Sequence, residues 1–235
     1  MNKFLVFLLA LSVNFTFAQS ASISVTNARS NFSNTQITSA SGIWVTNYSR
    51  TKNLKGSPYL FDSWNSSNAS IYIKNDKSYK FKNLNYNVQM ERFEAKFTED
   101  SILTFNPKNI EKVVLNGKTF RRYLDPEYQR NSFFEELAVT KSISILRKHE
   151  IEIVKGNINP ITHKKIAEDQ MVQKEKYYYT VDNKTLKETK LNKSSILKSI
   201  DPNKKDALKQ YVKDNNLNYS DVNDLKRVLE YYNTL

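Results

Sequence analysis

The chain has 235 residues and a formal net charge of +12, from 36 lysines and arginines against 24 aspartates and glutamates. It has no cysteine, which excludes disulfides, thiol nucleophiles, zinc–thiolate sites and iron–sulfur clusters. Hydrophobic residues make up 39% of the chain and aromatic residues 12%, enough for a core that needs no disulfides. The positive charge is spread along the chain, which favours a solvated surface over a nucleic-acid interface.

The N-terminus has the pattern of a secretory signal peptide. Lys3 precedes an almost unbroken apolar run over residues 4–13, and the small residue Ala18 follows. The run is too short to cross a membrane, which takes about twenty apolar residues. We therefore predict that residues 1–18 are removed and that the mature chain begins near Gln19. Its predicted location is the periplasm or the cell surface, and no transmembrane segment is expected in it.

The part of the chain that follows is predicted to be rich in β-strands. Residues 19–42 are rich in Ser, Thr and Asn, so we expect a polar leader there. Over residues 43–191 apolar residues recur with period two, as in Ile71 and Ile73. Turn signals separate these runs, and the strongest is the Asn-Gly pair at 116–117, because both residues tolerate the positive φ of a type I′ turn. We predict a mainly β fold, an antiparallel meander that forms a sandwich or a half-open barrel.

Residues 192–235 have the spacing of helices. Asp201 and Pro202 are typical of an N-cap and a first helical residue, and Ser220 is predicted to cap the last helix. In that helix the apolar residues recur at i, i+3, i+4 and i+7: Leu225, Val228, Leu229 and Tyr232. We predict two or three short C-terminal α-helices. Because such helices cannot form a core alone, we expect this tail to dock on the β domain.

Three stretches of the sequence carry a resemblance to known proteins. They are FFEELAVTKSISILRKHEIEIVKG, the NGKTF turn before it, and the ending LKQYVKDNNLNYSDVNDLKRVLEYYNTL. They resemble a functionally uncharacterised group of secreted proteins of Bacteroidetes, mostly flavobacterial. The resemblance covers about the second half of the chain, and the terminal helical motif is its most specific part. It implies an envelope location and supplies no catalytic residue.

The sequence shows no catalytic or metal-binding frame. His149 and His163 are the only imidazoles, and they are too far apart for a His-Glu-x-x-His metal motif. No serine has the Gly-x-Ser-x-Gly context that would expose a nucleophile. In a strand, Glu135 and Glu136 would point to opposite faces, whereas glycosidase carboxylates converge across a cleft. We predict that both histidines lie on the surface, that there is no catalytic residue or metal site, and that no cofactor is used.

Aromatic residues gather in a Ser- and Asn-rich region and form the candidate binding site: Trp44, Tyr48, Tyr59, Phe61 and Trp64. Exposed Trp and Tyr side chains on loops commonly stack on sugars or line apolar pockets. The alternative is that these residues close one end of the β core. We prefer the alternative, because aromatic side chains usually pack.

These features favour an exported, non-enzymatic binding or structural protein of the cell envelope. Its partner would be an envelope glycan, a lipid or another envelope protein, and no nucleic acid. The second hypothesis is a periplasmic carrier that holds an acyl chain or another apolar ligand in a half-open β-barrel. The third is an envelope hydrolase, which would require His149 or His163 to converge with a carboxylate in a cleft.

Overall fold

The protein is described by a computed structural model, which gives only the backbone for residues 21–22, 42–46 and 77. The described residues are 21–22, 42–46, 54–66, 68–74, 77–98 and 101–235. Three of the sequence predictions fall outside them: the signal peptide at 1–18, most of the leader at 19–42, and Tyr48 of the aromatic cluster.

The fold is mainly β, as predicted, with 45% of the residues in strands and 19% in helices. The larger sheet has the strand order β1-β5-β4-β9-β10-β11-β12-β13-β14, and β3 also pairs with β13. From β9 to β14 it is the predicted antiparallel meander, whereas β1 and β3 pair in parallel with β5 and β13. The strands are β1 (Ala21–Ser22), β3 (Leu54–Lys55), β4 (Ala69–Ile73), β5 (Lys77–Phe81), β9 (Ile110–Leu115), β10 (Lys118–Asp125), β11 (Arg130–Val139), β12 (Ser144–Val154), β13 (Asp169–Thr180) and β14 (Lys187–Thr189).

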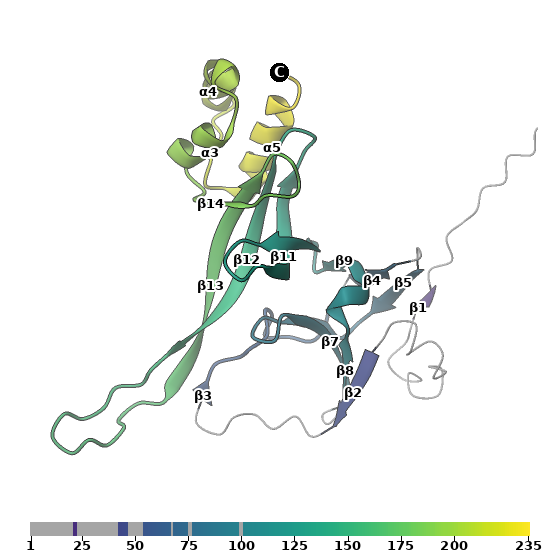
Figure 1. Ribbon diagram of the computed structural model, residues 1–235, viewed down its shortest axis with the longest axis vertical. Coiled ribbons are helices and arrows are strands. Elements are labelled where there is room, and N and C mark those ends of the chain that lie inside the picture. The colour runs from purple at the N-terminus through teal and green to yellow at the C-terminus, as the bar shows by residue number, and fades with distance from the viewer. Residues whose placement is uncertain (1–20, 23–41, 47–53, 67, 75–76, 99–100) are drawn as a thin grey trace, which may run out of the picture.

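A smaller sheet packs face to face on one end of the larger one (Figure 1). Its strands are, in spatial order, β2 (Gly42–Thr46), β8 (Ser101–Phe105), β7 (Arg92–Thr98) and β6 (Leu84–Asn87). The Phe93 ring of β7 lies 4.9 Å from the Phe133 ring of β11 and 5.5 Å from the Phe120 ring of β10, centroid to centroid. The two sheets therefore share one aromatic core, as in a sandwich. The larger sheet stays open within the described residues.

The Asn-Gly pair forms the predicted hairpin turn between β9 and β10. Asn116 has a φ of 51° and Gly117 a φ of 77°, and Leu115 pairs with Lys118 across the turn. Positive φ at both central residues is what a two-residue turn of this type requires, and Asn and Gly reach it at the lowest cost.

Three helices follow the β domain and pack against the far end of the larger sheet (Figure 1). Asp201 caps the short 3₁₀ turn as predicted, whereas the cap of the last helix is Asp221 and not Ser220. Across the described part of the chain, none of the helices has the length and apolar character needed to span a membrane. The elements are α3 (Lys193–Ser199), the 3₁₀ turn η3 (Pro202–Lys204), α4 (Lys205–Asp214) and α5 (Val222–Tyr232); a further 3₁₀ turn, η2 (Pro107–Asn109), precedes β9.

The predicted apolar face of the last helix is buried. Leu225, Val228 and Leu229 are fully inaccessible to solvent, and Tyr232 is 7% exposed. They form a second core with side chains of β11 and β12, among them Leu137 and Ile145. One face of the larger sheet is thus covered twice: by the smaller sheet at one end and by the helices at the other.

Candidate functional site

The described members of the aromatic cluster lie at the edge of the aromatic core that the two sheets share. Tyr59 is 8% exposed, its ring meets the Trp64 ring at 4.6 Å, and Phe61 packs half-buried against the core. The Tyr59 hydroxyl donates a hydrogen bond of 2.7 Å to the buried carboxylate of Glu94. This is the arrangement expected if these residues close the core. For Trp44 only the backbone, in β2, is described, and a binding role of the cluster stays a prediction.

The prediction that His149 lies on the surface is wrong, whereas His163 is exposed as predicted. His149 is 6% exposed, and its Nε2 atom lies 2.7 Å from Oε2 of Glu135. The charged neighbours of His149 in the sequence, Lys148 and Glu150, suggested a solvated strand. However, β12 lies between β11 and β13 inside the sheet, so charged side chains there are buried as pairs.

Glu135 is the centre of a buried ionic cluster on β10, β11 and β12. Its Oε1 atom accepts hydrogen bonds of 2.8 Å from Lys118 and from Arg147. Its Oε2 atom accepts one of 3.0 Å from Arg147 and one of 2.7 Å from His149. Burial works to raise the pKa of the Glu135 carboxyl group, but these three donors outweigh it and lower the pKa to about 2. A carboxylate so fully engaged is no general base, because its lone pairs already hold fixed donors.

A second buried cluster lies on the opposite face of β12. The ammonium group of Lys148, 2% exposed, lies 2.5 Å from Oδ2 of Asp125 and 3.1 Å from Oε1 of Glu150. It also lies 4.2 Å from the centre of the Tyr128 ring. Burial works to lower the pKa of Lys148, but the two adjacent carboxylates raise it overall, so the lysine stays charged. Both buried clusters are internal ion pairs that hold strands together.

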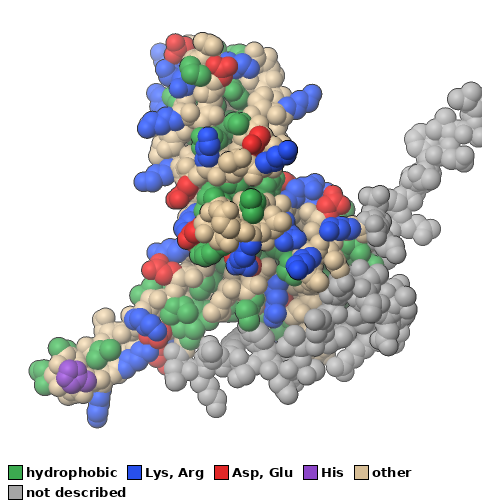
Figure 2. All heavy atoms as spheres, viewed as in Figure 1, with side chains coloured by type: hydrophobic (Ala, Val, Ile, Leu, Met, Phe, Trp, Pro, Cys, Tyr) green, Lys and Arg blue, Asp and Glu red, His purple; other side chains and the backbone are tan. Residues whose placement is uncertain are grey.

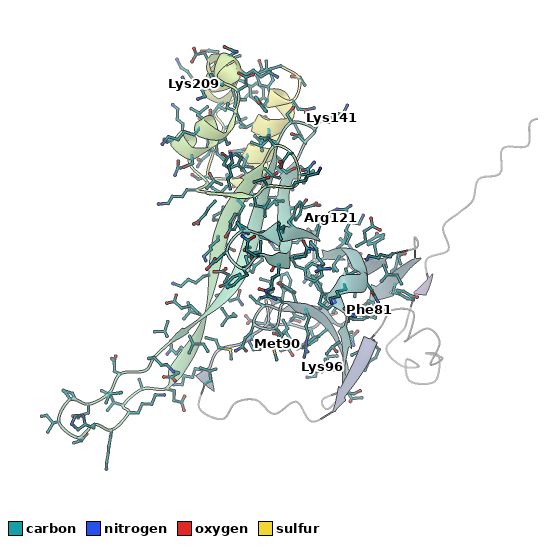
Figure 3. All side chains as sticks on the ribbon, viewed as in Figure 1. Phe81, Met90, Lys96, Arg121, Lys141 and Lys209 are labelled. Atoms are coloured by element: carbon teal, nitrogen blue, oxygen red, sulfur yellow. The ribbon has the colours of Figure 1, made fainter. Side chains whose placement is uncertain are left out.

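A groove on the surface is lined mainly by cationic side chains. It has a volume of about 560 Å³ and lies where the ends of β4, β9, β10 and β11 meet. Figure 2 shows Lys and Arg side chains gathered over this middle part of the molecule, and Figure 3 labels Arg121 there. Five cationic side chains and one carboxylate line the groove: Lys74, Lys108, Arg121, Arg122, Lys184 and Glu111.

Sheet pairing and one loop bring these side chains together. Arg121 pairs with Lys112 in the β9–β10 hairpin. The pairing of β9 with β4 shifts register at the end of β4, which leaves Glu111 without a paired residue on β4. Lys184 is placed by a turn in which Oδ1 of Asp182 accepts hydrogen bonds of 2.9 and 2.8 Å from the amides of residues 184 and 185. The buried side chain of Leu186 anchors this loop on the face of the sheet opposite the helices.

The charges of the groove are only partly compensated. Arg121 lies 3.6 Å from Glu111 and 3.3 Å from Glu136. Among the described residues, Lys74, Lys108 and Lys184 form no ion pair.

Arg122, which lines the groove, has one buried hydrogen-bond donor without a partner among the described residues. One terminal nitrogen of its guanidinium group donates to the carbonyl of Asn131 at 3.3 Å. Its Nε–H is buried and has no hydrogen-bond partner among the described residues, and burial lowers the pKa of Arg122. A buried donor without an acceptor costs free energy. An anion in the groove would supply the negative charge that its lining cations lack.

Comparison of the chain with family models, with curated proteins and with solved structures found no match.

Sequence reasoning missed the groove because its residues come from five separate segments. Only the adjacent pair Arg121-Arg122 is visible as a local concentration of charge. Lys74, Lys108 and Lys184 are single lysines in turns, and such lysines are common on any surface. In the described ranges, no group of three or more His, Asp and Glu side chains is arranged to hold a metal ion.

Proposed function

We propose that the chain is an exported, non-enzymatic binding protein of the cell envelope, and that its ligand carries phosphate or carboxylate groups. The observation that supports this most is the cationic groove, in which five cations face one lining carboxylate. Guanidinium groups bind phosphate and carboxylate through paired hydrogen bonds, which are roughly twice as strong as those between neutral groups. Tyr123 and Leu124 also line the groove and offer apolar surface to the rest of such a ligand.

The export part of the proposal is supported by the N-terminal pattern and by the resemblance to secreted proteins of Bacteroidetes. It predicts that the protein recovered from the envelope fraction of its host begins at or near Gln19. N-terminal sequencing measures this directly. Recovery of the chain from the cytoplasm with an intact Met1 would contradict export.

Binding of pyrophosphate, followed by isothermal titration calorimetry, tests the groove. We expect the wild-type protein to bind and the double variant Lys108→Gln/Lys184→Gln to bind about a hundredfold more weakly or worse, since each of the two lost charge-assisted contacts is worth about 1.5 to 3 kcal/mol. The matched control is Lys141→Gln/Lys174→Gln, which makes the same change in net charge away from the groove. It should bind like the wild type.

Two results would contradict this assignment. One is a wild-type protein that does not bind pyrophosphate at low ionic strength. The other is equal weakening in the groove variant and the control, which would mean that only the net charge of the protein matters.

No specific observation favours the other two hypotheses, a carrier of an acyl chain and an envelope hydrolase. An acyl carrier requires an apolar cavity between the sheets, but the rings of Tyr86, Phe93 and Phe120 contact one another there at centroid distances of 4.7 to 5.7 Å. A hydrolase requires an accessible base that converges with a carboxylate, but His149 is buried with its Nε2 atom engaged by Glu135, and the exposed His163 forms no ion pair with a carboxylate among the described residues.

A further inference from the structure

The hairpin of β12 and β13 extends beyond the body of the molecule as a projecting arm. The two strands pair without interruption from Ser144 and Thr180 at one end to Val154 and Gln170 at the other. Residues 155–168, which we call the tip, join them. Figure 1 shows the arm leaving the sheet and ending far from the helices.

The tip presents apolar side chains to solvent. Ile161 is 87% exposed, Ile166 is 67% exposed and Ile158 is 61% exposed. Single exposed apolar residues need no explanation, but three isoleucines within nine residues at the end of a projection form a patch. Figure 2 shows hydrophobic side chains beside the histidine and a basic side chain at the far end of the arm.

The backbone of the tip is internally hydrogen-bonded. The carbonyl of Asn159 accepts from the amide of His163 at 2.9 Å, and the amide of Asn159 donates to the carbonyl of Lys164 at 2.8 Å. The side chain of Asn159 accepts from the amide of Ile161, also at 2.8 Å. At the base of the tip the two chain segments approach closely, because a side chain at Gly156 would lie 1.9 Å from the carbonyl oxygen of residue 167. The isoleucines are thus carried by a turn that several internal hydrogen bonds hold in shape.

The charge of the tip is positive. It contains three lysines and one carboxylate, which are Lys155, Lys164, Lys165 and Glu168. Glu168 lies 3.5 Å from the ammonium of Lys55, so its charge is balanced outside the tip. Lys164 forms no ion pair with any described residue, whereas Lys155 and Lys165 both pair with Asp169, the first residue of β13, at 3.5 and 2.7 Å.

We propose that the tip binds the surface of an anionic lipid bilayer, with its isoleucines inserted among the head groups and its lysines on the lipid phosphates. Apolar side chains next to basic ones are the combination that interfacial binding uses. The tip is also a narrow projection, and the head groups of a fluid bilayer can rearrange around such a shape. This proposal is independent of the cationic groove.

Co-sedimentation with vesicles tests it. The wild-type protein should sediment with vesicles of phosphatidylglycerol and phosphatidylethanolamine. With vesicles of pure phosphatidylcholine it should remain in the supernatant. Binding should weaken as salt is added, because salt screens the lysines. The variant Ile161→Ser/Ile166→Ser should partition about tenfold less or worse, as expected from the apolar surface it loses.

Two control variants separate the tip from other surfaces. Val139→Ser/Val181→Ser removes exposed apolar side chains outside the arm, since Val139 is 52% and Val181 61% exposed. Lys108→Gln/Lys184→Gln removes charge from the groove. Both should bind the anionic vesicles like the wild type, and their thermal melts and that of the tip variant should match the wild-type melt.

Three outcomes would overturn the proposal. One is a wild-type protein that fails to sediment with anionic vesicles, and another is a tip variant that binds them as well as the wild type does. The third is a groove variant that loses binding as fully as the tip variant. If instead the tip variant changed only the oligomeric state of the protein, the occupant of the tip would be a second copy of the chain.

Discussion

Replacing Glu135 by alanine should lower the free energy of unfolding by about 3 to 5 kcal/mol, since it leaves buried cations without their acceptor. Glu135 is 4% exposed and is the shared acceptor of Lys118, Arg147 and His149. Urea denaturation measures the loss. Glu152→Ala is the matched control on β12, because its partner Lys174 lies 3.4 Å away and both side chains are more than half exposed. The control should cost no more than about 1 kcal/mol.

The same carboxylate predicts how stability depends on pH. The pKa of Glu135 is about 2 in the folded protein, below its ordinary value of 4.5. A group whose pKa is lowered by folding stabilises the protein above its unfolded pKa, and the stabilisation is lost as the pH falls through the folded value. The difference in unfolding free energy between the wild type and Glu135→Gln should therefore shrink between pH 4.5 and about 2. A constant difference over that range would contradict the ionic role of Glu135.

Replacing Leu229 by alanine should cost about 2 to 5 kcal/mol, through lost burial and the cavity left behind. Leu229 is fully buried in the second core, between α5 and the side chains of β11 and β12. The control on the same helix is Arg227→Ala. The Arg227 side chain is 53% exposed and lies 4.0 Å from Asp224, so its loss should change stability by about 0.5 kcal/mol or less. Equal urea midpoints for the two variants would mean that the helices do not stabilise the β domain.

The features that the sequence predicted are those that local spacing determines. Period-two runs identified the β domain, the Asn-Gly pair at 116–117 identified a hairpin, and the i, i+3, i+4, i+7 pattern identified the buried face of α5. The cap of α5 was misplaced by one residue, because Ser220 and Asp221 are both good N-cap residues. The side chain of Asp221 is the one that accepts the amides of residues 223 and 224.

The buried ionic clusters could not be predicted in the same way. Lys148, His149 and Glu150 form a charged run, and such a run usually marks a solvated face. Lys148 and His149 are buried because β12 is an interior strand, with Ile145 in the helical core and Ile151 against the core shared with the smaller sheet. The position of a strand within a sheet is a long-range property that one strand's sequence does not contain. Both ionic clusters depend on this long-range arrangement of the strands. The same arrangement brings the groove lysines together from separate turns.

Amide chemical-shift changes in solution would locate bound pyrophosphate and so test whether the cationic groove holds an anionic ligand. We expect saturable changes at the end of β10 near Arg122 and in the loop around Lys184, with the helices unaffected. Changes centred on the helical tail, or none at any pyrophosphate concentration, would contradict it.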